Sequence, residues 1–478
     1  MIAGEILVIL PELWVAGVAL LLLFLDLRWK GEGHRTMGML AAVGLLPAFF
    51  ILLLQQGGPA HSALGGMVQV DPLAIFFKGI FLVTAIGVIL MTRELADSFE
   101  RAHGEFYLLI LTATLGMLLA ASSHNFLMLF VSLELVTISF YVMTAYLKTD
   151  VRSLEAGMKY LILGSLASGF FLYGIAFIYG ATGSMDFKEI RDFLQQGSHL
   201  SPGLLLGLLL VLGGILFKGG GVPFHLWVPD VYEGAPTPVT AFLSVGSKAA
   251  GFIVALRIFH GLFLPSQQTW GTLVAFLAGL TILYGNLGAI PQKNIKRLLG
   301  YSSIGHAGYL LIGIACGSQL GSAAVNFYLL SYLFTNLAVF LVVTAFSRHI
   351  RSDAMRDYAG LSRRSPFLAA AMFLALLSLA GVPPLSGFFG KFLLLLSAVR
   401  EGFLWLALVG AAAVVISLYY YLLLVKTMYA EAPEDSTPIP VSVPVRVALI
   451  TCMLGMLGLG IWQDPFLNLS LAATKSLF

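Results

Sequence analysis

The chain has 478 residues, of which 59% are hydrophobic and 11% are charged, and its mean hydropathy is +0.92. Soluble domains carry about 25% charged residues, so this composition excludes a soluble protein and predicts an all-α integral membrane protein. The net charge of +3, with no basic cluster interleaved with aromatics, argues against a nucleic-acid partner.

The residues that usually hold redox cofactors are scarce. The two cysteines, Cys316 and Cys452, are too few for a four-cysteine iron–sulfur site. The glycines around Lys218 do not form a nucleotide-binding motif, because they lack the Gly-Lys-Ser/Thr ending and follow no strand. We therefore expect no cofactor and no metal in this chain, and any redox energy has to come from another polypeptide.

Runs of about 18 or more mainly apolar residues predict about 14 transmembrane helices in one polytopic membrane domain, residues 1–478. The first is expected to be a true span rather than a cleavable signal, because the basic residues follow it instead of preceding it. In chain order the predicted spans cover residues 6–25, 37–55, 73–92, 106–122, 125–146, 157–180, 203–226, 237–263, 270–290, 296–317, 321–346, 366–397, 402–428 and 443–463.

The seventh and twelfth predicted spans are interrupted at corresponding places. One contains Gly221-Val-Pro223 and the other Gly381-Val-Pro383, and proline removes a backbone donor, so both are expected to be broken helices. The recurrence five spans later predicts two inverted five-helix repeats, although glycine and proline are also common in membrane helices generally. The expected segments are helices 1–3 (1–105), the first repeat (106–263), the second repeat (270–428) and helix 14 (443–478).

Lysine and arginine are unevenly divided between the two sets of loops. Most of the 27 basic residues fall on the side of the first loop, which predicts that this side is cytoplasmic and that both termini lie outside. The loop at residues 228–236 is an exception, because it carries Asp230 and Glu233 and no basic residue.

Four of the charged residues inside predicted spans stand out, because the sequence around each is otherwise long and apolar enough to cross a membrane: Glu134, Lys218, Lys248 and Lys391. Each charge near the middle of a membrane costs about 2.5–3.5 kcal/mol on insertion scales unless it is paired, neutralised or hydrated. Intramembrane charges are functional by default, and buried lysines can gain and lose a proton near neutral pH. The pattern predicts proton transfer in which Lys218 pairs with Glu134, Lys248 accepts, and Lys391 is the last relay before an exit.

Structural alternatives exist for these residues. Glu134 could stay protonated and bond a neighbouring helix, and Lys218 is long enough to reach the interface. Lys248 is about twelve residues into its span, which is too deep for that explanation.

Further charged or titratable residues are weaker candidates. His225 and His306 could relay protons or support a broken helix. Lys78 is expected to extend to the interface and Arg257 to anchor it. Glu155 and Lys159 have the i,i+4 spacing of an exposed ion pair, and a role in coupling is left open.

Several long motifs together resemble one family. The segment from Phe217 to Phe242 reads FKGGGVPFHLWVPDVYEGAPTPVTAF, and two others are RLLGYSSIGHAGY (297–309) and GVPPLSGFFGKF (381–392). They resemble the antiporter-like membrane subunits of respiratory complex I, and YEGAPTPVT is similar to the subunit N branch. The resemblance extends over essentially the whole chain.

The resemblance implies a proton-pumping subunit of NADH:quinone oxidoreductase in a bacterial plasma (inner) membrane. In the family, a glutamate on the fifth helix and lysines on the seventh, eighth and twelfth form a polar axis, which matches Glu134, Lys218, Lys248 and Lys391. Subunit M has a glutamate at the last position, and we expect no lateral-helix extension of the subunit L type, because the sequence stops at Phe478. NADH, flavin, iron–sulfur clusters and quinone are then expected in partner subunits, with other membrane-arm subunits and membrane lipids as partners.

Two alternatives remain at this point. A subunit of an Mrp-type cation/proton antiporter shares this fold and axis, but would be driven by an ion gradient. A purely structural arm subunit would use its buried charges only to fix helix packing.

Overall fold

The computed structural model describes all residues except 1, 30–33, 57–60, 96–102, 197–199 and 434. Within the described residues, 13 helical segments are long and apolar enough to cross a membrane. The remaining predicted span, the twelfth, corresponds to two shorter apolar helices in succession, Pro366–Ala380 and Ser386–Arg400. The prediction of an all-α membrane protein is confirmed.

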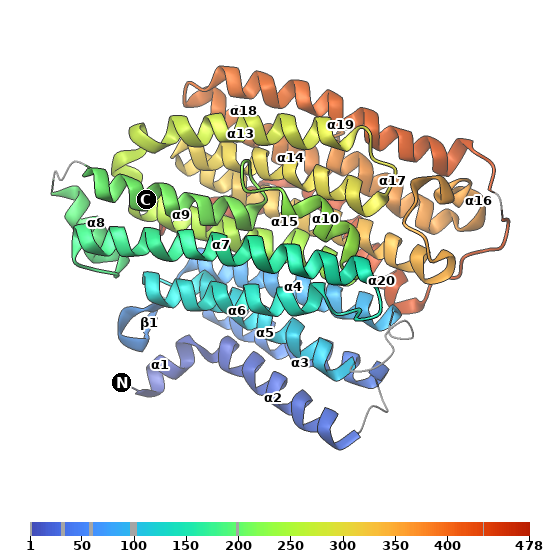
Figure 1. The fold of residues 1–478 in the computed structure, drawn as a ribbon, viewed down its shortest axis with the longest axis horizontal. Coiled ribbons are helices and arrows are strands. Elements are labelled where there is room, and N and C mark those ends of the chain that lie inside the picture. Colours follow the sequence, from blue (N-terminus) through green and yellow to red (C-terminus); the bar gives the residue numbers. More distant parts are fainter. Residues whose placement is uncertain (1, 30–33, 57–60, 96–102, 197–199, 434) are drawn as a thin grey trace.

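The helices lie side by side, with the N-terminal ones at one edge of the bundle and α19 at the other (Figure 1). The first part comprises α1 (Ile2–Val8), α2 (Leu10–Trp29), α3 (His34–Gln55), β1 (His61–Ala63), η1 (Leu64–Gly66), β2 (Val68–Val70) and α4 (Pro72–Glu94). The next part comprises α5 (His103–Ser122), α6 (Phe126–Thr144), α7 (Val151–Thr182), α8 (Phe187–Gln195), α9 (Pro202–Gly219), α10 (Trp227–Gly234), α11 (Thr237–Phe242), η3 (Leu243–Ser247), α12 (Lys248–Ala255) and η4 (Leu256–Leu262).

The last part begins after η4 and extends to the C-terminal helix. It comprises η5 (Leu264–Ser266), α13 (Gln267–Ala289), α14 (Ile295–Cys316), α15 (Gln319–Ile350), η6 (Met355–Tyr358), α16 (Leu361–Arg364), α17 (Pro366–Ala380), α18 (Ser386–Arg400), α19 (Leu404–Ala430), α20 (Val443–Ile461) and α21 (Gln463–Thr474). The strands β1 and β2 form an antiparallel hairpin in which His61 is opposite Val70.

Short polar side chains begin many of the helices. Asp71, Asn125 and Ser201 each accept a hydrogen bond from a main-chain N–H of the first turn, and a proline follows Asp71 and Ser201 directly. These residues satisfy donors that would otherwise be left free at a helix start, and proline fits there because it has no N–H.

The centre of the bundle is formed by the span from Thr237 to Leu262 together with α14 and α15. Every residue in the most apolar window of the first is buried, as are 94% and 89% of those in the other two. A span that is apolar on all sides is expected in such a position, because it touches protein rather than lipid. Lys248 and His306 therefore lie in the interior of the protein.

Both predicted helix breaks are present. The helix α9 ends at Gly219 and α10 begins at Trp227, while α17 ends at Ala380 and α18 begins at Ser386. Gly221 and Pro223 lie in the first interruption and Gly381 and Pro383 in the second, as predicted. The inverted relation of the two repeats stays a prediction.

The expectation that Arg257 anchors the membrane interface is wrong. Its side chain is 3% exposed and forms two hydrogen bonds with Asp71, from Nη2 to Oδ1 at 2.9 Å and from Nη1 to Oδ2 at 3.1 Å. It also donates to the carbonyl of Ala121 and contacts His124. Burial by itself would raise the pKa of Asp71, but the charge and hydrogen bonds of Arg257 lower it to about 2. The pair ties α4 to η4.

The expectation that Lys78 extends to the interface is also wrong. Its Nζ lies 2.6 Å from the Glu12 carboxylate, and the two side chains are 0% and 4% exposed. The pair has ion-pair contact without the geometry of a well-formed hydrogen bond. Lys78 is held inside because α2 supplies an opposite charge at the same depth, which sequence spacing alone does not reveal.

Replacing Asp71 with alanine should lower the free energy of unfolding by about 3–5 kcal/mol, because Arg257 would remain as an unpaired buried charge. Since the pKa of Asp71 is lowered, its contribution is complete above about pH 4 and is lost as the pH falls toward 2. Thermal unfolding of the purified protein assembly at neutral pH measures the difference.

The matched control is Arg356→Gln, which removes a charge from an ion pair whose arginine is 87% exposed. This change should cost at most about 1 kcal/mol. Equal effects of the two substitutions would contradict a stabilising role for the buried pair.

Candidate functional site

The four charged residues singled out from the sequence come from four different helices. Glu134 is on α6, Lys218 is in the last turn of α9, Lys248 begins α12, and Lys391 is on α18. Lys248 and Lys391 are each 3% exposed, while Glu134 and Lys218 are half-buried. The contacts of each residue decide whether the four can act together.

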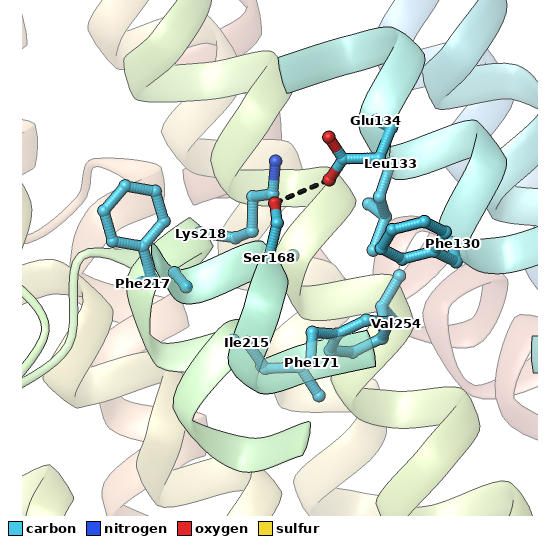
Figure 2. A pocket seen from close by; sticks show the side chains of 12 residues that line it. Phe130, Leu133, Glu134, Ser168, Phe171, Ile215, Phe217, Lys218 and Val254 are labelled. Atoms are coloured by element: carbon cyan, nitrogen blue, oxygen red, sulfur yellow. Dashed lines mark hydrogen bonds between the residues drawn. The ribbon is translucent and has the colours of Figure 1, made fainter. Parts of the chain in front are cut away.

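Glu134 and Lys218 line the same small cavity, but they do not form an ion pair. Figure 2 shows the Ser168 hydroxyl donating a hydrogen bond to Glu134, at 2.6 Å, while Lys218 lies beside them. Lys218 donates instead to the Thr137 hydroxyl, one helical turn after Glu134. The cavity has a volume of about 20 Å³, which is enough for one water molecule. The two charged side chains therefore line one cavity that has room for a water molecule.

The first helix break sets the position of Lys218. Gly220 adopts a left-handed conformation with φ of +76°, and the Gly221 N–H donates to the Leu216 carbonyl at 2.7 Å, so α9 ends at Gly219, directly after the lysine. The Val222 N–H donates to Thr281 Oγ1 on α13 at 3.1 Å. The C-terminal end of a helix also favours a cation, because the last carbonyls carry partial negative charge.

Lys248 is positioned by a local change in helix geometry. The five residues before it form a π-helical turn, η3, which rotates the following helix relative to an ordinary α-helix. Its Nζ donates to the Ser303 carbonyl and to Ser303 Oγ, the latter at 2.5 Å. Ser303 Oγ also lies 2.9 Å from the Tyr232 hydroxyl, so Lys248 belongs to a buried hydroxyl network.

The second helix break gives Lys391 its partners. The Lys391 Nζ donates to the carbonyls of Leu379 and Ala380, at 2.8 and 3.1 Å, where α17 ends. Gly381 has a φ of +88°, and a Cβ there would lie 3.1 Å from Lys391 Cδ, so glycine suits both the turn and the space. The Nζ also lies 4.9 Å from the centre of the Tyr309 ring. Carbonyls freed by the break thus hold this cation.

His306 lies between the last two lysines. Its Nδ1 is hydrogen-bonded to the Tyr328 hydroxyl and its Nε2 lies 3.3 Å from the Tyr421 hydroxyl. The charges of both Lys391 and Lys248 act on it. The Tyr332 ring is 5.3 Å from Lys248 Nζ and 5.2 Å from the His306 ring, so it separates the lysine from the histidine.

His225 is in a different situation. It is buried in the first break, and its ring packs edge-on against Tyr284 with 4.1 Å between ring centres. Neither ring nitrogen forms a well-formed hydrogen bond with the described residues. The contacts link His306 to two of the lysines, and they provide no comparable link for His225.

Glu155 and Lys159 form the i,i+4 ion pair that their spacing predicts, at 2.6 Å. Lys159 also pairs with Asp230 at 2.6 Å, and Arg297 pairs with both Asp230 and Glu233. Burial alone would raise the pKa of Asp230, but hydrogen bonds from Lys159 and Arg297 lower it overall. The acidic segment at 228–236, predicted as a loop, lies mostly in the short helix α10, and it receives its positive charges from neighbouring segments.

The sequence analysis missed the polar residues that connect these charges. Ser168 and Thr137 contact Glu134 and Lys218, while Ser303 and Tyr232 extend the network of Lys248. Serine and threonine are frequent in membrane helices, where they often bond the preceding turn, so residue type alone did not distinguish them. Within the described part of the chain, no group of three or more His, Cys, Asp or Glu side chains could hold a metal ion.

Comparison with known proteins gives one consistent result. The family model described as "NADH:quinone oxidoreductase/Mrp antiporter, TM" matches residues 123–417. The chain is 44% identical over 471 residues to NADH-quinone oxidoreductase subunit N of Moorella thermoacetica, covering 98% of both chains.

Solved structures are also similar. A chain of respiratory complex I from Thermus thermophilus is 33% identical, with a TM-score of 0.82 and coverage of 96% of this chain and 98% of that one. A chain of the Mrp complex from Dietzia reaches a TM-score of 0.88 at 21% identity, covering 100% of this chain and 98% of that one, which is a similarity of fold alone.

Replacing Thr281 with valine, which has nearly the same shape, should lower the free energy of unfolding by about 0.5–1.5 kcal/mol, because the half-buried Val222 N–H would lose its acceptor. The matched control is Thr451→Val, since this exposed threonine bonds only the carbonyl of its own preceding turn. The thermal unfolding midpoint of the purified assembly checks both. If Thr281→Val behaved like the control, the Thr281 hydrogen bond would not stabilise the break.

Proposed function

The chain belongs to the subunit N family of NADH-quinone oxidoreductase, and we propose that Glu134, Lys218, Lys248 and Lys391 form its proton relay. It is a multi-pass membrane-arm subunit of complex I, and a role in proton translocation follows from the family. The relay and the order of its steps go beyond what family membership provides.

The observation that carries the proposal is the set of partners around each lysine. Each ammonium has oxygen acceptors: the Thr137 hydroxyl for Lys218, Ser303 for Lys248, and the Leu379 and Ala380 carbonyls for Lys391. Among the residues that the structure describes, none of the three lysines pairs with a carboxylate. Neutral acceptors can bond either protonation state, because a neutral amine still has two N–H donors, whereas an ion pair would favour the charged state.

The first step involves Glu134 and Lys218. When the two groups are joined through the water-sized cavity, the negative charge of Glu134 favours the protonated lysine. When they separate, Lys218 releases its proton toward Lys248. His306 then connects Lys248 with Lys391, because its ring lies beside Tyr332, which is next to Lys248, and beside Tyr309, which is next to Lys391. The glycine and proline breaks support transfer, because they expose main-chain groups to which ordered water can bond.

The energy for this cycle comes from outside the chain. Moving one charge against 100 mV requires about 2.3 kcal/mol, and an equilibrium relay cannot supply it. In this proposal quinone reduction in partner subunits, which hold NADH, flavin, iron–sulfur clusters and quinone, changes the field along the membrane arm. Both termini lie on the outer side of a bacterial plasma membrane, as the distribution of basic residues indicates.

Replacing Lys248 or Glu134 with alanine in the complete complex should reduce proton pumping per NADH oxidised on the order of 100-fold. The reason is that an unassisted proton would face a penalty of about 2.5–3.5 kcal/mol in the membrane interior. Proton pumping is measured as acidification of the proteoliposome lumen during NADH-driven quinone reduction. The control variant is Lys426→Ala, at an exposed lysine. Unchanged pumping in both site variants would refute the relay. Sodium-dependent transport without NADH oxidation would favour the antiporter alternative.

Lys391 offers a test against a purely structural role, because it also bonds the end of α17. Lys391→Gln keeps an amide donor for the Leu379 and Ala380 carbonyls but cannot carry the proton, whereas Lys391→Leu loses both functions. We expect Lys391→Gln to assemble normally and to pump poorly, and Lys391→Leu to assemble less well. Measuring both the amount of intact complex and the rate of proton pumping separates an effect on assembly from an effect on proton transfer. Assembly and pumping falling together in the glutamine variant would contradict the relay.

A further inference from the structure

We propose that a groove between α3, α4, α15 and α21 binds one acyl chain of a phospholipid whose anionic headgroup sits at Lys475. The groove has a volume of about 580 Å³, within the range of about 300–1,000 Å³ that is typical of small-molecule sites. Its walls come from helices that are far apart in sequence. The inference does not depend on the proton relay, and its test reads bound lipid rather than pumping.

The inner walls of the groove are apolar and only half-buried. On α15, which is otherwise almost fully buried, Leu330 and Phe334 lie one turn apart and both face the groove. On α4, the half-buried residues Ile75, Gly79 and Val83 form a stripe at intervals of four residues along the same surface. This spacing places them on one face of the helix, so the two helices present a continuous apolar surface.

Polar residues occur at one end of the groove only. Gln55 ends α3 and Gln56 follows it, Asp71 precedes α4, and Lys475 follows α21. Val83 lies twelve residues along α4 from Asp71, which corresponds to about 18 Å at 1.5 Å per residue. One leaflet of the hydrocarbon core is about 15 Å thick, half of about 30 Å. The groove thus has the polarity and length of one lipid tail with its headgroup at the rim.

The net charge of the residues at the polar end of the groove indicates which lipid headgroup would bind there. The Asp71 carboxylate is bonded through both oxygens to Arg257, so it is already neutralised. Lys475 is exposed and forms no ion pair with the described residues. A free ammonium at the membrane surface attracts a lipid phosphate, and more strongly one whose headgroup carries net negative charge. We therefore infer an anionic phospholipid rather than a zwitterionic one.

Glycine at position 79 keeps the groove open. A Cβ built at Gly79 meets no atom within 4 Å, so a larger side chain there would project into the groove without a clash at its base. Gly79→Leu should therefore fill the groove and leave the helix packing intact. A Cβ at Gly17 on α2 likewise meets no atom within 4 Å, and this exposed glycine does not line the groove, so Gly17→Leu is the control.

The test uses phosphatidylglycerol with a photoreactive diazirine in one acyl chain, added to the complete purified complex in nanodiscs. After irradiation, we expect adducts on peptides containing Ile75–Val83 and Leu330–Phe334. Their yield should fall about tenfold in Gly79→Leu, a loss of about 1.4 kcal/mol in binding, and stay unchanged in Gly17→Leu. Equal yield in wild type and Gly79→Leu would overturn the proposal, and so would adducts spread evenly over all lipid-facing helices.

The headgroup is tested by competition with lipids that lack the diazirine. Phosphatidylglycerol should displace the probe better than phosphatidylcholine, and Lys475→Gln should reduce this preference about fivefold, since one surface lysine contributes about 1 kcal/mol. Lys188→Gln, an exposed lysine on α8 outside the groove, is the control. An unchanged preference in Lys475→Gln would refute the role of Lys475.

A neighbouring polypeptide is the other possible occupant. A photoreactive phenylalanine at position 76, which lines the groove, distinguishes the two by the mass added on irradiation. An increase of one lipid mass supports the proposal. A cross-link to another subunit would show that protein fills the groove and would overturn it.

Discussion

A cation inside a membrane has to keep hydrogen-bond acceptors, and this requirement shapes the interior of the chain. The broken helices meet it at two places. At the end of α17 the Leu379 and Ala380 carbonyls, which no longer bond a following turn, accept from Lys391. At the end of α9 the break directly follows Lys218. The helix break and the lysine therefore occur together, because the break leaves main-chain carbonyls without hydrogen-bond donors and the lysine needs acceptors.

The same requirement explains why hydroxyl groups surround the lysines of the proposed relay. Ser303, Tyr232 and the tyrosines around His306 provide acceptors that carry no charge, so the lysines are solvated without being fixed in ion pairs. Elsewhere in the membrane the chain uses the opposite arrangement. Glu12 with Lys78 is a closed, buried pair in which each charge has an opposite charge as its direct partner. The contrast separates charges suited to proton transfer from charges suited to holding helices together.

The helix α4 has a central place among these static contacts. Lys78 joins it to α2, Asp71 joins its start to Arg257 near the end of the eighth span, and its half-buried stripe forms one wall of the proposed lipid groove. The N-terminal helices are thus tied to the central span by ion pairs near one membrane surface. A lipid in the groove would fill the remaining space between α4 and α15, where protein packing is incomplete.

The sequence by itself determined the membrane class, the positions of the spans, both helix breaks and the four charges of the proposed relay, because each is a local property of composition or of glycine and proline. It also identified the family, since YEGAPTPVT and the related motifs are long and specific. Only the tertiary structure decided which side chains pair with or hydrogen-bond to the buried charges. Lys78 and Arg257 looked like residues at the interface until Glu12 and Asp71, 66 and 186 residues away, proved to neutralise them. The choice of Thr137 and Ser303 over other hydroxyls depends likewise on which helices pack together, and spacing along one chain does not encode that.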